Sequence, residues 1–389
     1  MARPDSGSSD APKSYQYGDH RVPDMGDRAV RFGHWRASAY VSFFLGALSL
    51  LGVLCFRFPE YLTTPELRAA YDVDFLRTLL RVTMTVTLAL GIVSFWRSRD
   101  RKSIAALGLL CAGVAVVLGG YHVQGRAVEH EVLFVGVDWF VLDLLGSAFL
   151  FVLIEKLLPK YREQVVLRPE WGVDLTYFAI NHFLISVFIL VVNGFAPRAF
   201  GWAVNDSVGT WIRALPFPLE VLLLVLAADL AQYWVHRAFH EIPVLWPVHA
   251  VHHSTEYMDW LAGSRMHLVQ ELVDRSMVMV PLYLLGASTS ALNAYVIIAA
   301  FQAVFVHANV GLRFGFLRYL FVTPQFHHWH HSKDKPAIDT NYAVHLPLWD
   351  KLFGTFHLPG DHWPKEYGTV HALPKSIFGQ FLYPFRGSR

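Results

Sequence analysis

Long apolar stretches separated by short polar loops dominate the chain from residue 38 onwards. Six are long enough to cross a bilayer as helices, which takes about 17–25 residues: 38–56, 76–96, 103–120, 137–155, 174–194 and 217–235. Two shorter ones, 275–287 and 291–306, are joined by a turn at Gly286–Thr289. Because Glu271, Asp274 and Arg275 begin the first of these and are costly in lipid, we expect a helical hairpin and leave open whether it spans. The pattern predicts an all-α, polytopic membrane protein with about six transmembrane helices.

The composition supports a membrane protein. Of the 389 residues, 54% are hydrophobic and 16% are charged, against about 25% charged in ordinary soluble domains. The formal net charge is +2, and no basic patch interleaved with aromatic residues is present, so no nucleic-acid partner is expected. The two cysteines, Cys55 and Cys111, both lie in apolar stretches and indicate no disulfide framework.

Lys and Arg predict the orientation, because cytoplasmic loops carry an excess of them. Six lie before the first apolar stretch, and the loops after the second and fourth stretches are also rich in them: Arg97, Arg99, Arg101, Lys102, Lys156, Lys160, Arg162 and Arg168. We therefore expect a flexible cytoplasmic tail at 1–33, transmembrane helices at 34–215, and a domain at 216–389 whose polar end and C-terminus face the cytoplasm. The oligomeric state is not predicted.

Histidines are concentrated late in the chain, where eleven of the 20 lie between positions 236 and 331. His236 and His240 are spaced i and i+4, whereas His249, His252 and His253 are spaced i, i+3 and i+4, and His327, His330 and His331 repeat that triplet. On a helix such offsets bring side chains close together. The eight imidazoles are too many for one ion of usual coordination number and suit two. All-nitrogen ligation is compatible with zinc, copper, iron or nickel, so the spacing predicts a two-metal site without identifying the metal.

These histidine motifs carry a resemblance to a known family. "HRAFH", "HAVHHS" and "HHWHHS", in this order, resemble the histidine boxes of the fatty acid hydroxylase/sterol desaturase superfamily. "DLAQYWVHR" from Asp229, "SRMH" at Ser264–His267, "HANV" at His307–Val310, "NYAVHLPLWDKLFGTF" from Asn341 and "GQFLYPF" from Gly379 are similar to stretches around those boxes. The resemblance covers roughly 217–385, and the first five apolar stretches lie outside it.

The resemblance implies a non-haem di-iron centre that activates O2 to hydroxylate or desaturate a lipid, in a bacterial inner membrane. The implied ligands are the eight box histidines His236, His240, His249, His252, His253, His327, His330 and His331. His307 is an expected ninth ligand and His267 a weaker tenth, while His328 is expected to support the ligands or lie at the surface. Zinc is expected to replace iron in some preparations.

Further residues are expected to support the ligands. Asp229, Tyr233, His236 and His240 are spaced to share one helix face, so the Asp229 carboxylate is predicted to accept a ring N–H from a metal-bound histidine. Tyr233 and Asn341 are likewise expected to support the metal ligands. His182, a polar residue within the fifth apolar stretch, is not assigned a role.

The sequence also bears on the electron source and the substrate. No haem-attachment, Gly-rich nucleotide or cysteine-cluster motif is present, so a separate cytoplasmic electron-donor protein is expected. A sterol-like or fatty acyl lipid is the first substrate hypothesis, and a polar-headed lipid such as an ornithine lipid or an ether lipid is the alternative. A membrane metal-handling protein that uses the same histidines is the hypothesis from another functional class.

Overall fold

Helices make up most of the regular secondary structure in the described residues. The computed structural model describes residues 14–17, 20–23, 36–97, 102–125, 128, 134–184 and 195–386. Within them the only strands are an antiparallel pair, β1 (Ser14–Tyr17) and β2 (His20–Pro23). The predicted all-α class is therefore confirmed. The pair falls inside the segment predicted to be a flexible tail, and most of that segment lies outside the described residues.

The chain forms two compact units. One comprises residues 31–149 and 182–189, and the other comprises residues 1–30, 150–181 and 190–389. Residues 150–181, which the sequence grouped with the N-terminal helices, therefore make their contacts in the unit that carries the histidines. Helix α6 (Val137–Leu157) continues from the first unit into the second.

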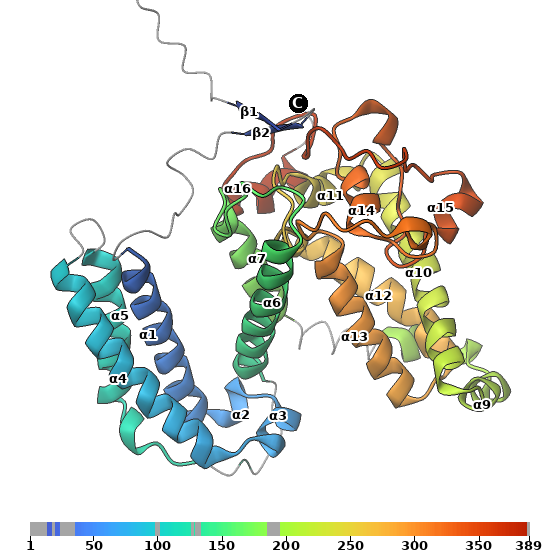
Figure 1. Ribbon diagram of the computed structural model, residues 1–389. Coiled ribbons are helices and arrows are strands. Elements are labelled where there is room, and N and C mark those ends of the chain that lie inside the picture. Colours follow the sequence, from blue (N-terminus) through green and yellow to red (C-terminus); the bar gives the residue numbers. More distant parts are fainter. Residues whose placement is uncertain are drawn as a thin grey trace, which may run out of the picture. The chain divides into compact units, whose positions relative to one another are not determined.

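In the first unit, α1 (Arg36–Arg57), α4 (Val73–Arg97) and α5 (Lys102–Val117) pack side by side (Figure 1). The approach of α1 to α5 needs small residues, since a Cβ on Gly108 would lie 2.8 Å from the backbone of Ser42, as is common between helices in membranes. The remaining short elements of this unit are α2 (Pro59–Leu62), α3 (Pro65–Ala70) and η2 (Gly120–His122).

In the second unit, α10 (Phe217–Glu241) packs against α12 (Leu268–Leu285) and α13 (Thr289–Phe305). Their shared core contains Val221, Leu224, Val225, Ala228, Leu282, Ala291 and Tyr295. Gly286 ends α12 in the left-handed conformation at φ 59°, and the Ser288 hydroxyl caps α13 by accepting the Ala291 N–H. The buried Glu220 carboxylate accepts the N–H and the hydroxyl of Ser288, which fastens this turn to the start of α10.

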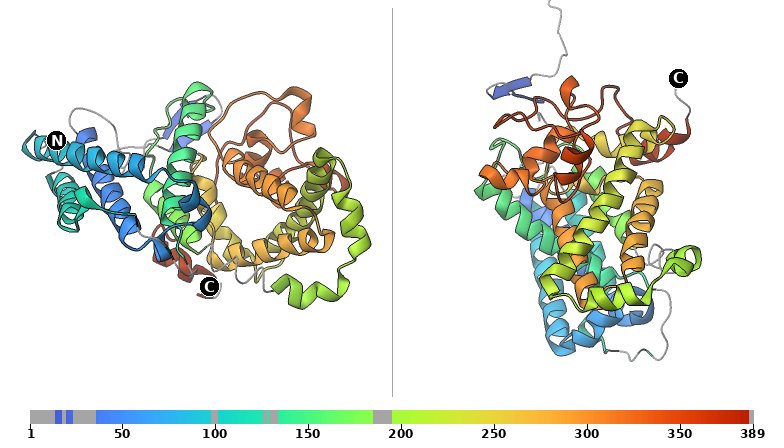
Figure 2. Two further views of the ribbon diagram at one scale, coloured as in Figure 1. Left: turned by 90° about the horizontal axis from the view of Figure 1, so that it is seen from below. Right: turned by 90° about the vertical axis from the view of Figure 1, so that its right-hand side faces the viewer.

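The histidine-bearing elements gather at one end of these helices. They are the last turns of α10, α11 (Trp246–His253) and α14 (Pro324–His330), as Figure 1 shows. Figure 2 gives two further views of the same arrangement. Pro247 and Pro324 occupy first-turn positions of α11 and α14, where a missing N–H is tolerated. The other elements of the unit are α7 (Trp171–Phe183), α9 (Asp206–Arg213), α15 (Leu348–Phe353), α16 (Ile377–Leu382), η3 (Gly201–Ala203), η4 (Ala262–Ser264), η5 (Gly315–Tyr319), η6 (Lys335–Ala337) and η7 (Tyr383–Phe385).

Four helices in the described residues are long and apolar enough to cross a membrane: residues Ser38–Arg57 of α1, α4, α6 and α10. The stretch predicted at 103–120 forms α5 with only 16 residues. The stretch predicted at 174–194 is represented by α7, and 185–194 lie outside the described residues. The hairpin is confirmed as α12 and α13, but α12 begins at Leu268, seven residues before the predicted start.

Candidate metal centre

Nine histidines come together in two groups at the end of the α10–α13 helices. The first group is His236, His240, His249, His253 and His330, and the second is His252, His307, His327 and His331. Within each group the nitrogens available as ligands all lie within 4.8 Å of one another. The eight box histidines and His307 are therefore brought together as the sequence predicted, and in two groups as the count of imidazoles predicted.

Helix geometry explains how two boxes contribute to both groups. Residues i and i+4 on a helix point about 40° apart, whereas i+3 lies about 60° to the other side of i. Accordingly His249 and His253 join the first group while His252 joins the second, and His327 and His331 join the second while His330 joins the first. Each triplet thus lies between the two groups and supplies both.

The Nδ1 atoms of most of these rings face oxygen acceptors. The Nδ1 to oxygen distances are 2.8 Å from His236 to the Tyr342 carbonyl, 2.9 Å from His249 to Gln270 Oε1, 3.1 Å from His252 to the Arg265 carbonyl, 2.8 Å from His307 to the Ala303 carbonyl and 2.8 Å from His330 to the Thr340 carbonyl. A carbonyl oxygen only accepts, so Nδ1 carries the proton and Nε2 carries the lone pair. This is the support that metal-bound histidines usually have.

The Nε2 atoms then face one another without a proton between them. They are 3.0 Å apart in His236 and His249 and 3.2 Å apart in His252 and His307. Burial and the neighbouring His307 hold the pKa of His252 well below 6.5, and burial lowers that of His307 to about 4. Imidazolium protons therefore do not relieve the lone-pair repulsion at neutral pH. A metal ion does, because nitrogens bound to one ion at about 2.1 Å and at right angles lie about 3 Å apart. The residues fit two metal ions.

The ligand set narrows the metal without fixing it. Neutral imidazoles suit zinc, copper, iron and nickel, and no cysteine or carboxylate belongs to either group among the described residues. The five nitrogens of the first group exceed the four ligands of a closed zinc site, and the four nitrogens of the second group match that number. Among the described residues, one carboxylate hydrogen-bonds to a ring of these groups: Asp339 Oδ1 lies 3.2 Å from Nδ1 of His240.

The predicted role of Asp229 is wrong in its details. Its buried carboxylate accepts the backbone N–H groups of Val344, His345 and Leu346 at 2.8–2.9 Å, and within the described residues it accepts no hydrogen bond from a histidine ring. The three unpaired N–H groups of a tight loop supply a better-placed set of donors than a ring one turn away. Asp229 therefore supports the site indirectly, because it anchors the loop whose Tyr342 carbonyl orients His236.

Tyr233 and Asn341 hydrogen-bond to neighbouring segments rather than to a histidine ring. The Tyr233 hydroxyl contacts the Thr355 hydroxyl at 2.9 Å. The Asn341 amide donates to the carbonyls of Phe326 and His357 and accepts the His357 N–H. Asn341 has φ 61°, a left-handed conformation that asparagine adopts more readily than most residues. It thereby ties α14, which carries His327 and His330, to the segment around His357.

His267 and His328 lie apart from both groups. The His267 Nδ1 caps α12 by accepting the Val269 N–H, and its Nε2 lies 3.2 Å from the Phe381 carbonyl. Both nitrogens are thus engaged elsewhere, and the expectation of a tenth ligand does not hold. His328 is completely buried, with Nδ1 2.9 Å from the Tyr367 hydroxyl and Nε2 3.3 Å from the His307 carbonyl, so it supports the segment that carries His307.

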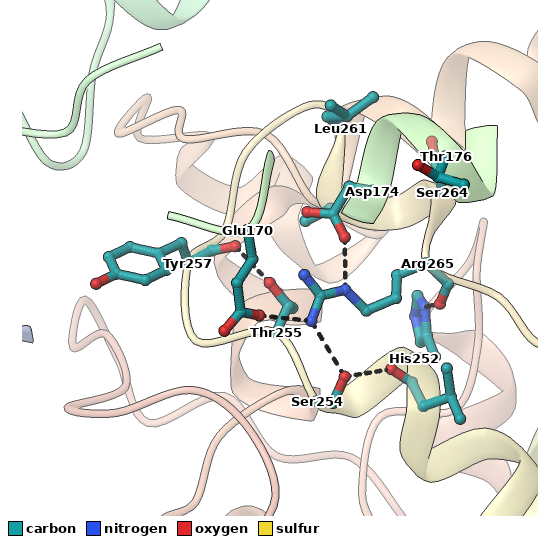
Figure 3. Close-up of polar contacts among 12 residues, drawn as sticks. Glu170, Asp174, Thr176, His252, Ser254, Thr255, Tyr257, Leu261, Ser264 and Arg265 are labelled. Atoms are coloured by element: carbon teal, nitrogen blue, oxygen red, sulfur yellow. Dashed lines mark hydrogen bonds and ion pairs between the residues drawn. The ribbon is translucent and has the colours of Figure 1, made fainter. Parts of the chain in front are cut away.

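A buried ion network lies behind His252 (Figure 3). Arg265 donates from its guanidinium to Asp174, Glu170 and the Ser254 hydroxyl, while its backbone carbonyl faces His252. Arg168 joins the network through Asp174 and through a two-pronged pair with Asp259 at 2.8 and 2.9 Å. Both arginines are fully buried. Arg168, which the sequence counted as a cytoplasmic loop charge, is therefore an internal structural residue.

A second brace comes from the end of α6. The Glu155 carboxylate accepts the N–H groups of Trp260 and Asn309 at 2.7 and 2.9 Å. The Asn309 side chain in turn bonds both the N–H and the carbonyl of Tyr161. Residues 155–174, outside the stretch that resembles the family, thus hold the loops that follow His253 and His307.

Sequence reasoning missed several of these supports. No regular spacing from the histidines marks Gln270, Asp339 or Asp259 in the sequence. Partners that act through a backbone carbonyl, such as Tyr342, cannot be recognised from their side chains. The charged residues Arg168 and Asp174 carried a usable one, because each is a charge within or beside an apolar stretch and so needs a partner.

Comparisons with known proteins agree with the site. Residues 221–355 match the fatty acid hydroxylase family. The chain is 29% identical over 281 residues to the ornithine lipid hydroxylase OlsE of Rhizobium tropici, covering 71% of this chain and 82% of that protein. It is 30% identical over 189 residues to the alkylglycerol monooxygenase of Danio rerio, covering 49% of this chain and 39% of the relative. A very-long-chain aldehyde decarbonylase, GL1-6 of Oryza sativa subsp. indica, is 24% identical over 204 residues, covering 50% of this chain and 29% of that protein. No solved structure matches the chain.

These relatives are lipid-modifying enzymes by name, and the matched family domain of this chain, residues 221–355, contains all three of its histidine boxes. The predicted resemblance, the membrane character and the assignment as an enzyme are thereby confirmed. Residues 221–355 thus form a domain of the fatty acid hydroxylase family, as the resemblance predicted, and the protein is an oxidoreductase, as expected.

Proposed function

We propose that the protein is a membrane-bound, O2-dependent hydroxylase of a polar-headed membrane lipid, with two iron ions held by the nine histidines of the two groups. The observation that supports it most is the facing of unprotonated Nε2 atoms in each group, with Nδ1 committed to oxygen acceptors. Such a set binds cations and leaves the imidazoles neutral. Bound iron would supply the O2 chemistry that zinc lacks.

The protein's own residues provide the surroundings for that chemistry. Eight of the nine rings belong to buried residues, and the His240 side chain is 4% exposed, so water is largely excluded from the ligands. Exclusion of water limits wasteful side reactions of a reactive oxidant. The carbonyl and amide partners of Nδ1 fix the ring planes, which keeps the ligands in place without adding negative charge.

The polar-headed lipid replaces the sterol-like substrate as the leading hypothesis. The relatives named above are an ornithine lipid hydroxylase and an alkylglycerol monooxygenase, and the first of these is matched over most of its length. Electrons are proposed to come from a separate protein on the cytoplasmic side, the side to which the Lys- and Arg-rich loops assign the histidines.

The test is expression of the chain in a host that contains ornithine lipid, with an alkylglycerol or a sterol supplied in parallel cultures. Lipid mass spectrometry should show one added oxygen atom in a polar-headed lipid, and none with the His252→Ala, His330→Ala double variant. An oxygenated sterol alone would overturn the substrate class. Metal uptake into proteoliposomes without any oxygenated lipid would instead support the metal-handling hypothesis.

A further inference from the structure

Two short segments outside the candidate membrane spans expose many apolar side chains. In η5 and its flanks these are Leu312, Phe316, Leu317, Leu320 and Phe321, and in α15 they are Leu348 and Leu352. Phe316 is 72% exposed and Leu352 is 64% exposed. Single exposed apolar residues are ordinary on protein surfaces, but gathered ones mark a contact surface.

The two segments form one continuous surface. The Lys351 ammonium of α15 donates to the Tyr319 carbonyl of η5 at 2.8 Å. It also lies 5.3 Å from the centre of the Tyr319 ring and 5.2 Å from that of Phe356. We call residues 312–321 together with Leu348, Lys351 and Leu352 the apolar apron.

The apron adjoins a membrane-spanning helix at its histidine end. Phe353 of α15 packs on Trp234 of α10 with ring centres 4.9 Å apart. Trp234 is 48% exposed and lies two residues before His236, and α10 is one of the candidate spans. Tryptophan favours the boundary between the acyl chains and the headgroups. The apron therefore lies beside the end of α10 that Trp234 would place at this boundary.

The charges of the apron fit the same environment. The Arg313 side chain is 87% exposed, and Lys351 is exposed as well. Long basic side chains with apolar neighbours keep their stems in the acyl region and their charges among phosphates. The exposed Asp361 carboxylate pairs with Arg318 and lies 4.0 Å from the Arg313 guanidinium. One carboxylate therefore faces Arg313, Arg318 and Lys351, which leaves this surface with a net positive charge.

We propose that the apolar apron is inserted in the headgroup–acyl boundary of the bilayer, with Arg313 and Lys351 on lipid phosphates. The proposal goes beyond the proposed function and does not need it. Its consequence is a depth for the metal centre, since Pro324, the first residue of α14, follows Phe321 closely and His327 lies one turn further on. A lipid whose headgroup stays among the phosphates would then have only its first chain carbons to bring to the histidines.

The test uses single cysteines in a Cys55→Ala, Cys111→Ala background, because these are the two native cysteines. Phe316→Cys and Leu352→Cys probe the apron. Val370→Cys is the matched control, since Val370 is 71% exposed in the same unit. Each is labelled with an environment-sensitive fluorophore and reconstituted into vesicles of phosphatidylcholine and phosphatidylglycerol that carry a spin label near the headgroup.

The labels at 316 and 352 should be quenched by the spin-labelled lipid and the label at 370 should not. Labels at 316 and 352 that stay unquenched would overturn the proposal, and would leave the apron as a candidate site for a soluble protein partner. Equal quenching at all three positions would also overturn it. Metal content is measured on the same samples, so that a failure of the metal proposal is recognised separately.

The charge component has its own variants. Arg313→Gln and Lys351→Gln should each shift the equilibrium of the apron away from the anionic bilayer by about fivefold, the usual contribution of one basic residue at such a surface. Quenching of the label at 316 should fall accordingly, and Lys333→Gln, a basic residue outside the apron, should leave it unchanged. Equal effects of all three substitutions would contradict phosphate contact by the apron.

Discussion

His252 donates from Nδ1 to the backbone carbonyl of Arg265 at 3.1 Å, and the side chain of the same arginine is locked into a buried ion network (Figure 3). The orientation of a proposed metal ligand is thus coupled to charges that lie outside the family domain, since Asp174 and Glu170 precede residue 221. A buried arginine is tolerated only when its partners are in place. The network therefore holds the Arg265 backbone, and with it the carbonyl that faces His252, in one position.

Substitution of Arg265 by Met is expected to release the second metal group selectively. It leaves the buried Asp174 carboxylate with fewer partners, which costs about 3–5 kcal/mol of stability, and it frees the loop that orients His252. We expect metal content to fall from about two ions per chain to about one, measured by elemental analysis of purified protein. Arg77→Gln, which breaks the exposed pair with Asp74, is the control. Retention of both metals in Arg265→Met would show that the network does not position His252.

Asp339 is expected to tune the first group. Its carboxylate contacts Nδ1 of His240, and such outer partners typically contribute 10–100-fold to metal affinity. Asp339→Asn keeps an acceptor and tolerates the observed φ of 57°, while it removes the charge. Competition with a chelator should therefore show weaker binding of one metal ion and unchanged binding of the other. Equal affinities in the two proteins would mean that the charge of Asp339 does not reach the metal.

A charged side chain at position 341 is expected to destabilise the protein even when its size is unchanged. In Asn341→Asp the two carbonyls of Phe326 and His357 that now receive amide N–H groups would face a carboxylate. Loss of these buried hydrogen bonds should lower the free energy of unfolding by roughly 2–4 kcal/mol. Hydrogen exchange in α14 should rise in the variant. Unchanged exchange there would contradict the view that Asn341 fastens the helix of the third box.

Acid is expected to release the metals and loosen the site together. Burial, followed by the charge of neighbouring imidazoles, holds the pKa of His252 and His331 well below 6.5, the value of about 6.5 being that of an unfolded histidine. Below that pH the unfolded chain binds more protons than the folded one, so stability is complete above about 6.5 and is lost as pH falls towards the folded values. Metal binding shifts the loss further down, because protons compete with the ions.

The measurement is metal content and protease sensitivity of residues 236–331 between pH 7.5 and pH 4 in detergent. We expect both to change steeply and at the same pH. A gradual loss of metal without any loss of protection would show that the histidines protonate one by one in a closed site.

The sequence specified the ligands better than their surroundings. Spacing alone brought together His236, His240 and the two triplets, because the i, i+3 and i+4 offsets of a helix impose proximity. It did not reveal that His252 belongs to the group of His327 and His331, or that His330 belongs to the first group, since that depends on how α11 and α14 face each other. The role of Asp229 was mistaken for the same reason. Its proximity to His236 on one helix was predictable, but the loop of Val344 that competes for its oxygens was brought there by tertiary folding.

The membrane topology, too, was only partly predictable from the sequence. The apolar stretches of α1, α4, α6 and α10 were predictable from composition, and all four helices are long enough to span. Arg168 was misjudged as a solvated loop charge, because only the fold reveals Asp174 and Asp259 around it. Short loops beside apolar helices are where a count of positive charges is least informative about burial.

The most direct test of two separate metal sites compares His236→Ala and His307→Ala with the exposed-histidine control His371→Ala. The first removes a member of the first group and the second a member of the second. The protein is purified with iron, and metal content and the iron Mössbauer spectrum are recorded. We expect about two ions per chain in the wild type and the control and about one in each variant, with different residual spectra, because each variant keeps the other group. A wild-type content near one ion, or identical residual spectra, would contradict two distinct metal sites.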